Sequence, residues 1–390
     1  MVDFKIGTYR LNEDSNFNFQ LNRVILWGGG RLEDVQKVAS GIHTCTDWKK
    51  SLITLGAEAE KGGRTENAIA YYRMSEFFMF DGDSDKKKYY LLATKMFYDY
   101  YREYFESGKI KQYQVPYENV KLPVLFAPAA RDKKGTLLLH GGNDSYMEEF
   151  FFVMLYFAEQ GYDTYLFEGP GQGGVLRVQN KHFTYEWEKP VKALLDTFNL
   201  NQVTIIGASL GGMLAPRAAA FDKRINRVIA WSVFTNFLDV LIGTRPAKVQ
   251  RMIRFYLKHN LKALANAIVG YKIKHGDEMV KWGFLHGMYA YEAKTPFEYL
   301  KKMDQYQIYN IADQITQDIL ILGATKDHFI DYRTVSSEIS ALTNARSITV
   351  RIFTEKEHGE SHCNIGNVKL ACDTMINWME YINDNEPFAH

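Results

Sequence analysis

The sequence contains only three cysteines, Cys45, Cys363 and Cys372, among its 390 residues. They show none of the paired spacings of a zinc site, and their odd number leaves at least one thiol unpaired. Such sparse cysteine is typical of a protein in a reducing compartment and not of a small disulfide-stabilised secreted domain. We therefore expect a cytoplasmic chain with no structural metal site.

Long apolar runs and an excess of charge of one sign are also missing. No apolar segment reaches the about 18 residues that a membrane-spanning helix needs. The first residues, "MVDFKIGTYRLNEDSNF", lack the basic stretch and apolar run of a secretory signal. Lysine and arginine number 47 against 46 aspartates and glutamates, so the formal charge is +1. This balance gives no electrostatic reason to expect nucleic acid or a membrane as a partner.

The first third of the chain has helical periodicity. Trp48, Leu52, Leu55 and Ala59 recur at intervals that place them on one helix face, and similar stripes follow after the turn "KGGR". We expect a helical domain over residues 1–112. Its first helix pair resembles one tetratricopeptide unit, but a repeat scaffold needs several such units.

After residue 112 short apolar runs alternate with helices of 12 to 16 residues, the pattern of a mostly parallel α/β sheet. "GTLLLH", "QVTIIG", "RVIAWS" and "DILILG" are among the expected strands. The alternation stops between residues 233 and 310, where only helical patterns occur. We therefore expect one sheet domain, built from residues 113–232 and 311–390, with a helical insertion at 233–310.

One serine stands where an apolar strand should turn sharply into a helix. In "VTIIGASLGGMLAPRAAA", Ser209 lies between Gly207 and Gly211, and larger side chains at those positions would collide with the strand and the helix. This pattern predicts a nucleophile elbow that exposes the serine hydroxyl at the sheet edge. The N–H groups at the start of the following helix favour a negatively charged oxygen nearby.

A serine nucleophile needs a base and a group that orients the base. In enzymes with such an elbow the acid and then the histidine follow the serine along the chain. Asp327 follows the strand "DILILGAT", with Asp331 as a remote substitute. The loop "KEHGESHCNIGN" offers two histidines. We favour His362, because more loop is available to reach over the sheet, and His358 stays a second candidate.

The tetrahedral oxyanion also needs hydrogen-bond donors. "LLLHGGNDS" ends an expected strand, and the backbone N–H of Gly142 or Asn143 could approach the oxyanion opposite that of Leu210. We interpret His140 as a structural histidine that hydrogen-bonds this loop. His328, beside Asp327, is expected at the solvent or at a pocket rim.

"EGPGQGG" fits the glycine pattern of dinucleotide-binding loops through Gly169, Gly171 and Gly174. That motif requires a helix to open at the third glycine. The following residues, "VLRVQNKHF", show no helical stripe, and Pro170 lacks an N–H group for a phosphate. We therefore expect a tight loop beside the serine and no bound nucleotide.

In this order, "HGGND", "EGPGQG", "GASLGG", Asp327 and "ESHC" resemble the α/β-hydrolases over about residues 113–390. The helical N-terminus and the "HC" segment resemble the FrsA-like branch, which includes dihydroxypseudooxynicotine hydrolase and fungal pigment hydrolases. Proteins labelled acylaminoacyl-peptidase or prolyl-oligopeptidase-like share this build, but their β-propeller pattern is missing here. The resemblance implies a triad of Ser209, Asp327 and His362, no metal, no organic cofactor, and a lid made by the N-terminal helices and the 233–310 insertion.

The expected function is therefore a serine hydrolase that cleaves an ester, amide or activated C–C acyl bond of a small apolar or aromatic substrate. Two alternatives stay open: an acylaminoacyl-peptidase-like exopeptidase acting on short peptides, and a catalytically silent binding protein with the same fold. A homodimer is possible. Asp239 either faces the pocket or is an exposed helix carboxylate. Candidate pocket aromatics, which core packing would also explain, are Trp231, Phe234, Phe237, Trp282, Phe284, Tyr289 and Tyr291.

Overall fold

The computed structural model describes residues 3–243 and 245–385. Helices precede the first strand, as the periodicity predicts: α1 (Ser15–Leu26), α2 (Leu32–Ala39), α3 (Cys45–Lys61), α4 (Thr65–Ser75), α5 (Ser84–Tyr100) and α6 (Arg102–Glu106). The predicted stripe of α3 faces inward, since Trp48, Leu52, Leu55 and Ala59 are all buried. These helices have their own apolar core, in which the Trp48 ring packs against Phe17 and Phe78.

The remaining chain forms an eight-stranded sheet in the order β1-β2-β4-β3-β5-β6-β7-β8. Strands β3 to β8 run parallel, whereas β2 pairs antiparallel to both β1 and β4. The strands are β1 (Lys111–Tyr117), β2 (Val120–Ala127), β3 (Gly135–His140), β4 (Tyr162–Phe167), β5 (Val203–Ala208), β6 (Ile225–Trp231), β7 (Asp318–Ala324) and β8 (Ser347–Phe353). This arrangement confirms the predicted mostly parallel α/β sheet.

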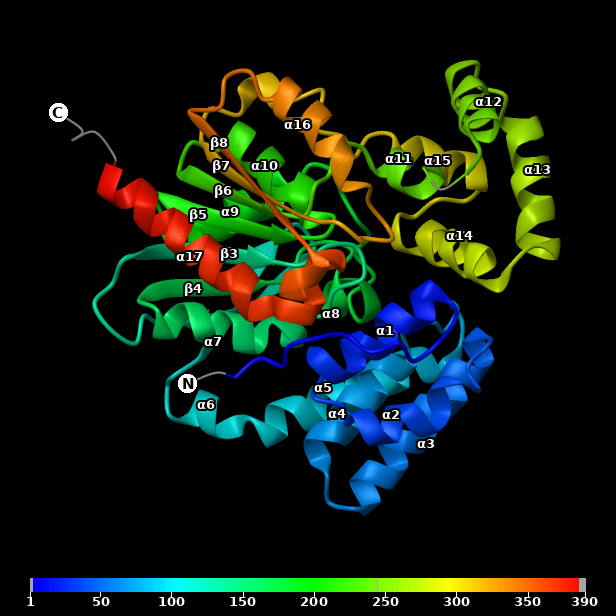
Figure 1. Cartoon of the computed structure of the whole chain (residues 1–390), viewed down its shortest axis with the longest axis horizontal. Coiled ribbons are helices and arrows are strands. Elements are labelled where there is room, and N and C mark those ends of the chain that lie inside the picture. Colours follow the sequence, from blue (N-terminus) through cyan, green and yellow to red (C-terminus); the bar gives the residue numbers. More distant parts are fainter. Residues whose placement is uncertain (1–2, 244, 386–390) are drawn as a thin grey trace.

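Helices cover both faces of the sheet (Figure 1). Alternate residues of β5 show why. Val203 and Ile205 pack toward α9 (Glu188–Thr197) and α10 (Gly211–Phe221), whereas Ile206 and Ala208 pack toward α7 (Phe151–Glu159) and α17 (Val368–Asn385). The covering elements are η1 (Met147–Phe150), α7 (Phe151–Glu159), α8 (Gly173–Arg177), α9 (Glu188–Thr197), α10 (Gly211–Phe221), α16 (Val335–Ala341) and α17 (Val368–Asn385).

Between β6 and β7 the chain leaves the sheet for a helical excursion, which lies beyond one end of the strands (Figure 1). Its helices are α11 (Phe237–Ile242), α12 (Ala247–Lys258), α13 (Lys262–His275), α14 (Glu278–Ala290) and α15 (Pro296–Met303). Helix α14 packs on the N-terminal helices, where the ring of Trp282 lies 5.4 Å from that of Phe77. In residues 3–243 and 245–385, no helix has both the length and the apolar character to cross a membrane.

Candidate active site

Ser209 lies at the turn between β5 and α10, in the left-handed backbone region with φ +60°. Such a conformation is strained for a residue with a side chain and persists only where the surroundings impose it. A Cβ atom at position 207 would lie 2.1 Å from the carbonyl oxygen of Gly211, so only glycine fits there. The turn therefore has the geometry of the predicted elbow.

The side chains of Ser209, His362 and Asp327 form one hydrogen-bonded chain. His362 Nε2 lies 2.9 Å from Ser209 Oγ, and His362 Nδ1 lies 2.6 Å from Asp327 Oδ2. The second carboxylate oxygen of Asp327 accepts hydrogen bonds from the backbone N–H groups of Phe329 and Ile330. Three residues that are distant in the sequence thus meet at the carboxyl edge of the sheet.

Burial and charge shift the pKa values of His362 and Asp327 in opposite directions. Burial alone would lower the pKa of His362, but the facing carboxylate of Asp327 outweighs it and raises that pKa well above the ordinary value. Burial would likewise raise the pKa of Asp327, yet the charge and hydrogen bond of His362 hold it below its ordinary value. The carboxylate is therefore ionised, and it favours a proton on His362.

The loop that carries His362 is shaped by left-handed residues and one amide side chain. The adjoining Cys363 and Asn364 have φ values of +50° and +52°. Asn364 accepts a hydrogen bond from Trp231 Nε1 at 3.0 Å and donates to the carbonyl of Gly359 at 2.8 Å. Trp231, which we considered as a pocket residue, is only 1% exposed and instead supports this loop.

Other candidates from the sequence lie elsewhere. His358 is an exposed residue at the end of the turn Glu355–Glu357, so His362 and not His358 reaches Ser209. Asp239 lies on α11, is 41% exposed and forms an ion pair with Arg254, which agrees with the alternative of an exposed helix carboxylate.

Two histidines beside the site are held in apolar surroundings. Burial lowers the pKa of His328 to about 4, and its ring lies 3.8 Å from that of Phe329. It is half-buried, so its ring is not fully exposed to solvent, and the expected place at a pocket rim stays a prediction. The His140 ring nitrogen Nδ1 lies 2.8 Å from the carbonyl oxygen of Gly141, in keeping with a structural histidine that braces the loop.

The loop after β3 touches the elbow, as predicted. A Cβ atom at Gly142 would lie 2.6 Å from the backbone nitrogen of Leu210. However, the N–H of Gly142 donates to Ser145 Oγ at 2.7 Å, so this predicted oxyanion donor is already occupied. The neighbouring Asn143 accepts a hydrogen bond on its side-chain oxygen from the hydroxyl of Tyr291 at 2.5 Å.

The "EGPGQGG" loop braces this region through a residue that the sequence analysis did not single out. Gln172, 1% exposed, donates from Nε2 to the carbonyl oxygens of Gly141 and Gly142 at 2.9 and 3.0 Å. Its own side-chain oxygen accepts from the N–H of Gly169 at 2.9 Å. The motif therefore fixes the loop that approaches the elbow.

The expectation that no helix opens within this glycine motif is wrong, because α8 begins at Gly173. However, a side chain of the protein already accepts a hydrogen bond from an N–H group at the start of α8. The buried carboxyl group of Glu168 accepts from the N–H of Gly174 at 2.8 Å and from that of Met147 at 3.0 Å. The glycine at 173 is required, since a Cβ atom there would lie 1.7 Å from a Glu168 oxygen. A phosphate would compete with this carboxyl group.

The N-terminal helices reach the candidate site through one aromatic side chain. Phe19 of α1 places its ring 5.9 Å from that of His362, on which the ring of Phe329 also packs at 5.1 Å. Nothing in the sequence pattern linked Phe19 to the triad, because the link depends on how the N-terminal helices dock.

The loop after β3 is also held by both helical parts. Arg23 of α1 pairs with Glu149 through two hydrogen bonds of 2.7 and 2.5 Å, and it donates to the backbone carbonyl of Asp144 at 2.6 Å. From the other side, His286 Nε2 of α14 lies 2.7 Å from the Asp144 carboxylate. The backbone beside the elbow therefore depends on contacts from α1 and α14.

The remaining candidate pocket aromatics divide into two groups. Phe234, Phe237 and Tyr291 are at most 6% exposed and belong to the main core. Trp282, Phe284 and Tyr289 are half-buried on the insertion. Core packing therefore explains the first group, whereas the second is partly accessible.

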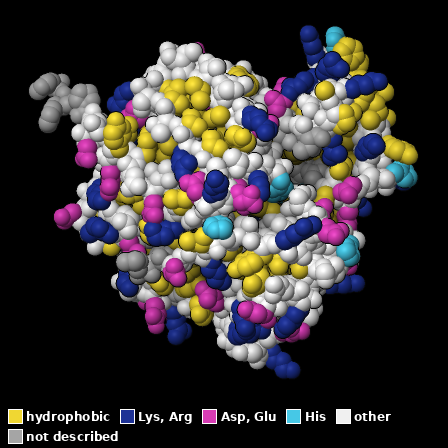
Figure 2. All heavy atoms as spheres, viewed as in Figure 1, with side chains coloured by type: hydrophobic (Ala, Val, Ile, Leu, Met, Phe, Trp, Pro, Cys, Tyr) yellow, Lys and Arg dark blue, Asp and Glu magenta, His cyan; other side chains and the backbone are white. Residues whose placement is uncertain are grey.

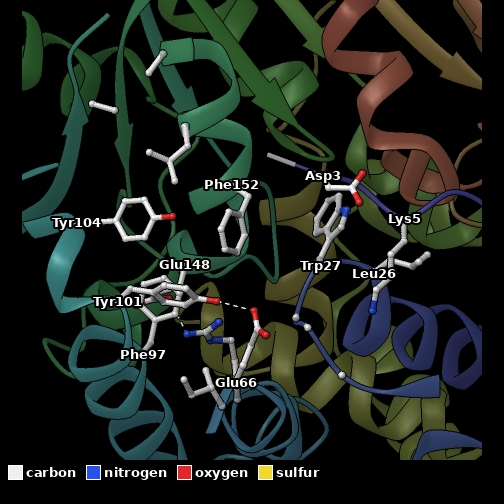
Figure 3. Close-up of a pocket in the computed structure, with 18 of the residues that line it drawn as sticks. Asp3, Lys5, Leu26, Trp27, Glu66, Phe97, Tyr101, Tyr104, Glu148 and Phe152 are labelled. Atoms are coloured by element: carbon white, nitrogen blue, oxygen red, sulfur yellow. Dashed lines mark hydrogen bonds and ion pairs between the residues drawn. The ribbon is translucent and has the colours of Figure 1, made fainter. Parts of the chain in front are cut away.

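A cavity of about 800 Å³ lies elsewhere, between the end of α1, α4 to α6, and α7. Figure 3 shows the rings of Phe97, Tyr101, Tyr104 and Phe152 around it. Ser209, Asp327 and His362 are not among the residues that line it. It is therefore separate from the candidate active site.

Comparisons with known proteins agree with this architecture. "Hydrolyase poxO" of Penicillium oxalicum is 26% identical over an alignment 420 positions long, which covers 95% of this chain and 98% of that protein. "20-hydroxy-prefusarin hydrolase FUS2" of Gibberella moniliformis is 28% identical over 337 residues, covering 80% and 79%.

Solved structures share the fold at lower identity. The crystal structure of 2,6-dihydroxy-pseudo-oxynicotine hydrolase superposes with a TM-score of 0.66 at 19% identity, covering 92% of this chain and 94% of that one. AbyA5 superposes with a TM-score of 0.64 at 13% identity, covering 90% and 89%. The family model described as "alpha/beta hydrolase fold" matches residues 137–358, more than half of the sequence. The chain therefore belongs to the alpha/beta hydrolase fold family.

Proposed function

We propose that the protein is a serine hydrolase in which Ser209 is the nucleophile, His362 the general base and Asp327 the residue that orients it. The observation that carries this proposal is the continuous hydrogen-bonded chain from Ser209 Oγ through His362 to Asp327, with separations of 2.9 and 2.6 Å. These distances lie within the reach that proton transfer between a nucleophile and its base requires. Because all three hydrogen-bonded side chains are in place, we do not favour a catalytically silent binding protein.

In the proposed reaction Ser209 Oγ attacks the carbonyl carbon of the substrate, and its proton passes to His362 Nε2. The tetrahedral intermediate collapses as its leaving group takes that proton, which leaves an acyl group on Ser209. Water then loses a proton to His362 and attacks the acyl carbon, so that the acid is released and the serine regains its hydrogen. Asp327 stays ionised and stabilises the imidazolium in both halves.

The oxyanion of the intermediate would accept hydrogen bonds from backbone N–H groups. Leu210, at the start of α10, is the first proposed donor, and Asn143 is the second. Gly142 would contribute only after its N–H leaves Ser145 Oγ, to which it donates in this structure. Of the two loop donors expected from the sequence, Gly142 and Asn143, we therefore propose Asn143.

The proposed substrate is a small molecule with an apolar or aromatic acyl group. The rings of Phe19 and Phe329 flank His362, so an acyl group on Ser209 would lie near aromatic carbon. Several relatives are named hydrolases, which supports hydrolysis. The choice among ester, amide and C–C bonds depends on the shape of the pocket.

Ser209→Ala tests the proposal. With 4-nitrophenyl esters, aminoacyl anilides and β-diketones as a substrate panel, we expect the purified protein to turn over at least one class. The variant should lose at least about a thousand-fold in kcat, because the nucleophile acts together with its base. Ser337→Ala, an exposed serine on α16, is the control and should keep full activity. Turnover that survives Ser209→Ala would disprove the assignment.

A further inference from the structure

One segment of the chain carries a strong excess of positive over negative charge. Residues 245–275 contain eight lysines and arginines and no aspartate or glutamate, although the whole chain has a formal charge of only +1. The rest of the protein is therefore net negative. The balanced total conceals this separation, which is why composition alone gave no reason to expect an anionic partner.

This segment forms α12 and α13, which project from the insertion and are poorly covered (Figure 1). Among the described side chains of α12 none is buried, and on α13 only Ala265 is. Arg254 pairs with Asp239 on α11. Other cations of the two helices are exposed: Lys248, Arg251, Lys258, Lys262, Lys272 and Lys274.

Large apolar side chains are exposed among these cations. Phe255 on α12 is 53% exposed, and Leu264 and Tyr271 on α13 are 48% and 64% exposed. Leu264, Ala267 and Tyr271 follow at helical spacing, so they share one face of α13. Figure 2 shows hydrophobic and basic side chains together on this projection, at the upper right of the molecule.

We propose that the α12–α13 hairpin docks on the surface of an anionic lipid membrane. Basic side chains attract the anionic headgroups, while exposed aromatic and aliphatic side chains insert at the acyl boundary. Two copies of the chain do not pair through this same face, because two surfaces of the same positive charge repel each other. An acidic protein would pair with the cations, but the apolar side chains interspersed on both helices favour lipid.

Vesicle co-sedimentation of the purified full chain tests this proposal. We expect binding to vesicles of phosphatidylcholine with 30% phosphatidylserine, no binding to phosphatidylcholine alone, and weaker binding as salt rises. Each cation near the surface contributes about five-fold to partitioning. The triple variant Lys258→Glu, Lys262→Glu and Lys274→Glu should therefore bind at least about a hundred-fold more weakly.

The matched control reverses three exposed lysines of the N-terminal helices, Lys50, Lys61 and Lys87, to glutamate. It has the same net charge as the triple variant and should keep its binding. Leu264→Ser is expected to weaken binding at high salt, where the apolar contribution dominates, and Ser209-dependent turnover reports that every variant is folded. Equal loss in the control, binding to neutral vesicles alone, or tighter binding to polyglutamate than to anionic vesicles would overturn the proposal.

Discussion

At the scale of single residues, the protonation of His362 is the most consequential feature. The imidazole is buried, which disfavours its charged form, yet the Asp327 carboxylate at 2.6 Å more than offsets this and raises its pKa. A base is active only when deprotonated. Activity should therefore rise with pH through a midpoint above the ordinary histidine value of about 6.5.

Asp327→Asn should move that midpoint. The substitution removes the charge that raises the pKa of His362 and leaves the burial that lowers it, so the midpoint should shift to lower pH. It should also reduce kcat by about ten-thousand-fold, because the asparagine no longer stabilises the imidazolium. The midpoint is measured from kcat/KM with an activated ester and, for the weak variant, from the imidazole resonance of His362.

Asp331→Asn is the control for this prediction. Asp331 lies in the same loop but is exposed and pairs with Arg333, so its removal should leave both kcat and the midpoint unchanged. An unchanged midpoint in Asp327→Asn would show that this carboxylate does not set the pKa of His362.

The sequence predicted the three triad positions because each follows an apolar strand, and parallel strands end at one edge of a sheet. It could not show that Phe19 lies on His362, since that contact depends on the docking of α1. Nor could it show that Ser145 occupies the N–H of Gly142, because this bond depends on the detailed path of one loop.

At the scale of elements, the loop after β3 is positioned by its neighbours. Gln172 at the start of α8 donates two hydrogen bonds to its carbonyl oxygens, and Arg23 of α1 donates a third to Asp144. Glycine-rich segments have little intrinsic order, so these donors supply it. The glycines of this motif permit close packing, since a Cβ atom at Gly169 would lie 2.4 Å from the Trp187 ring and one at Gly171 would lie 2.1 Å from the Phe183 ring.

Gln172→Glu should lower kcat with little change in KM. The shape of the side chain is kept, but the amide donor is replaced by a carboxyl oxygen that faces two carbonyl oxygens, so the loop beside Leu210 should shift. Displacement of an oxyanion donor costs about a hundred-fold or more in kcat. Steady-state kinetics of the variant measures both parameters.

Gln179→Glu provides the comparison. Its side chain also bonds a backbone carbonyl, that of Lys121, but far along the loop and partly exposed. We expect normal kinetics from it. A Gln172→Glu enzyme whose kcat is also normal would rule out the positioning role.

At the scale of the whole molecule, the sheet connects two helical parts that also contact each other. Trp282 of α14 packs on Phe77 and Phe78, and the carboxylate of Glu278 accepts a hydrogen bond from the N–H of Cys45. A buried charge cluster joins the N-terminal helices to the sheet, where Glu76 pairs with Arg177 of α8. The N-terminal helices therefore share an interface with the sheet and its covering helices.

The sequence predicted the class and order of these parts, because the change from helical to alternating periodicity is strong. It did not predict their contacts. Glu76 and Arg177 are charged residues that a sequence pattern would place at the surface, and they are buried only because each is paired across the interface. The placement of the two helical parts therefore depends on tertiary contacts that the sequence pattern does not reveal.

The most direct test of the central claim is to locate the residue that a fluorophosphonate modifies. After the wild-type protein is labelled and digested, mass spectrometry of its peptides should find the phosphonyl group on Ser209 alone, with labelling slowed in His362→Ala and unchanged in His358→Ala. A phosphonyl group on another residue, or equal labelling of Ser209→Ala, would contradict the account.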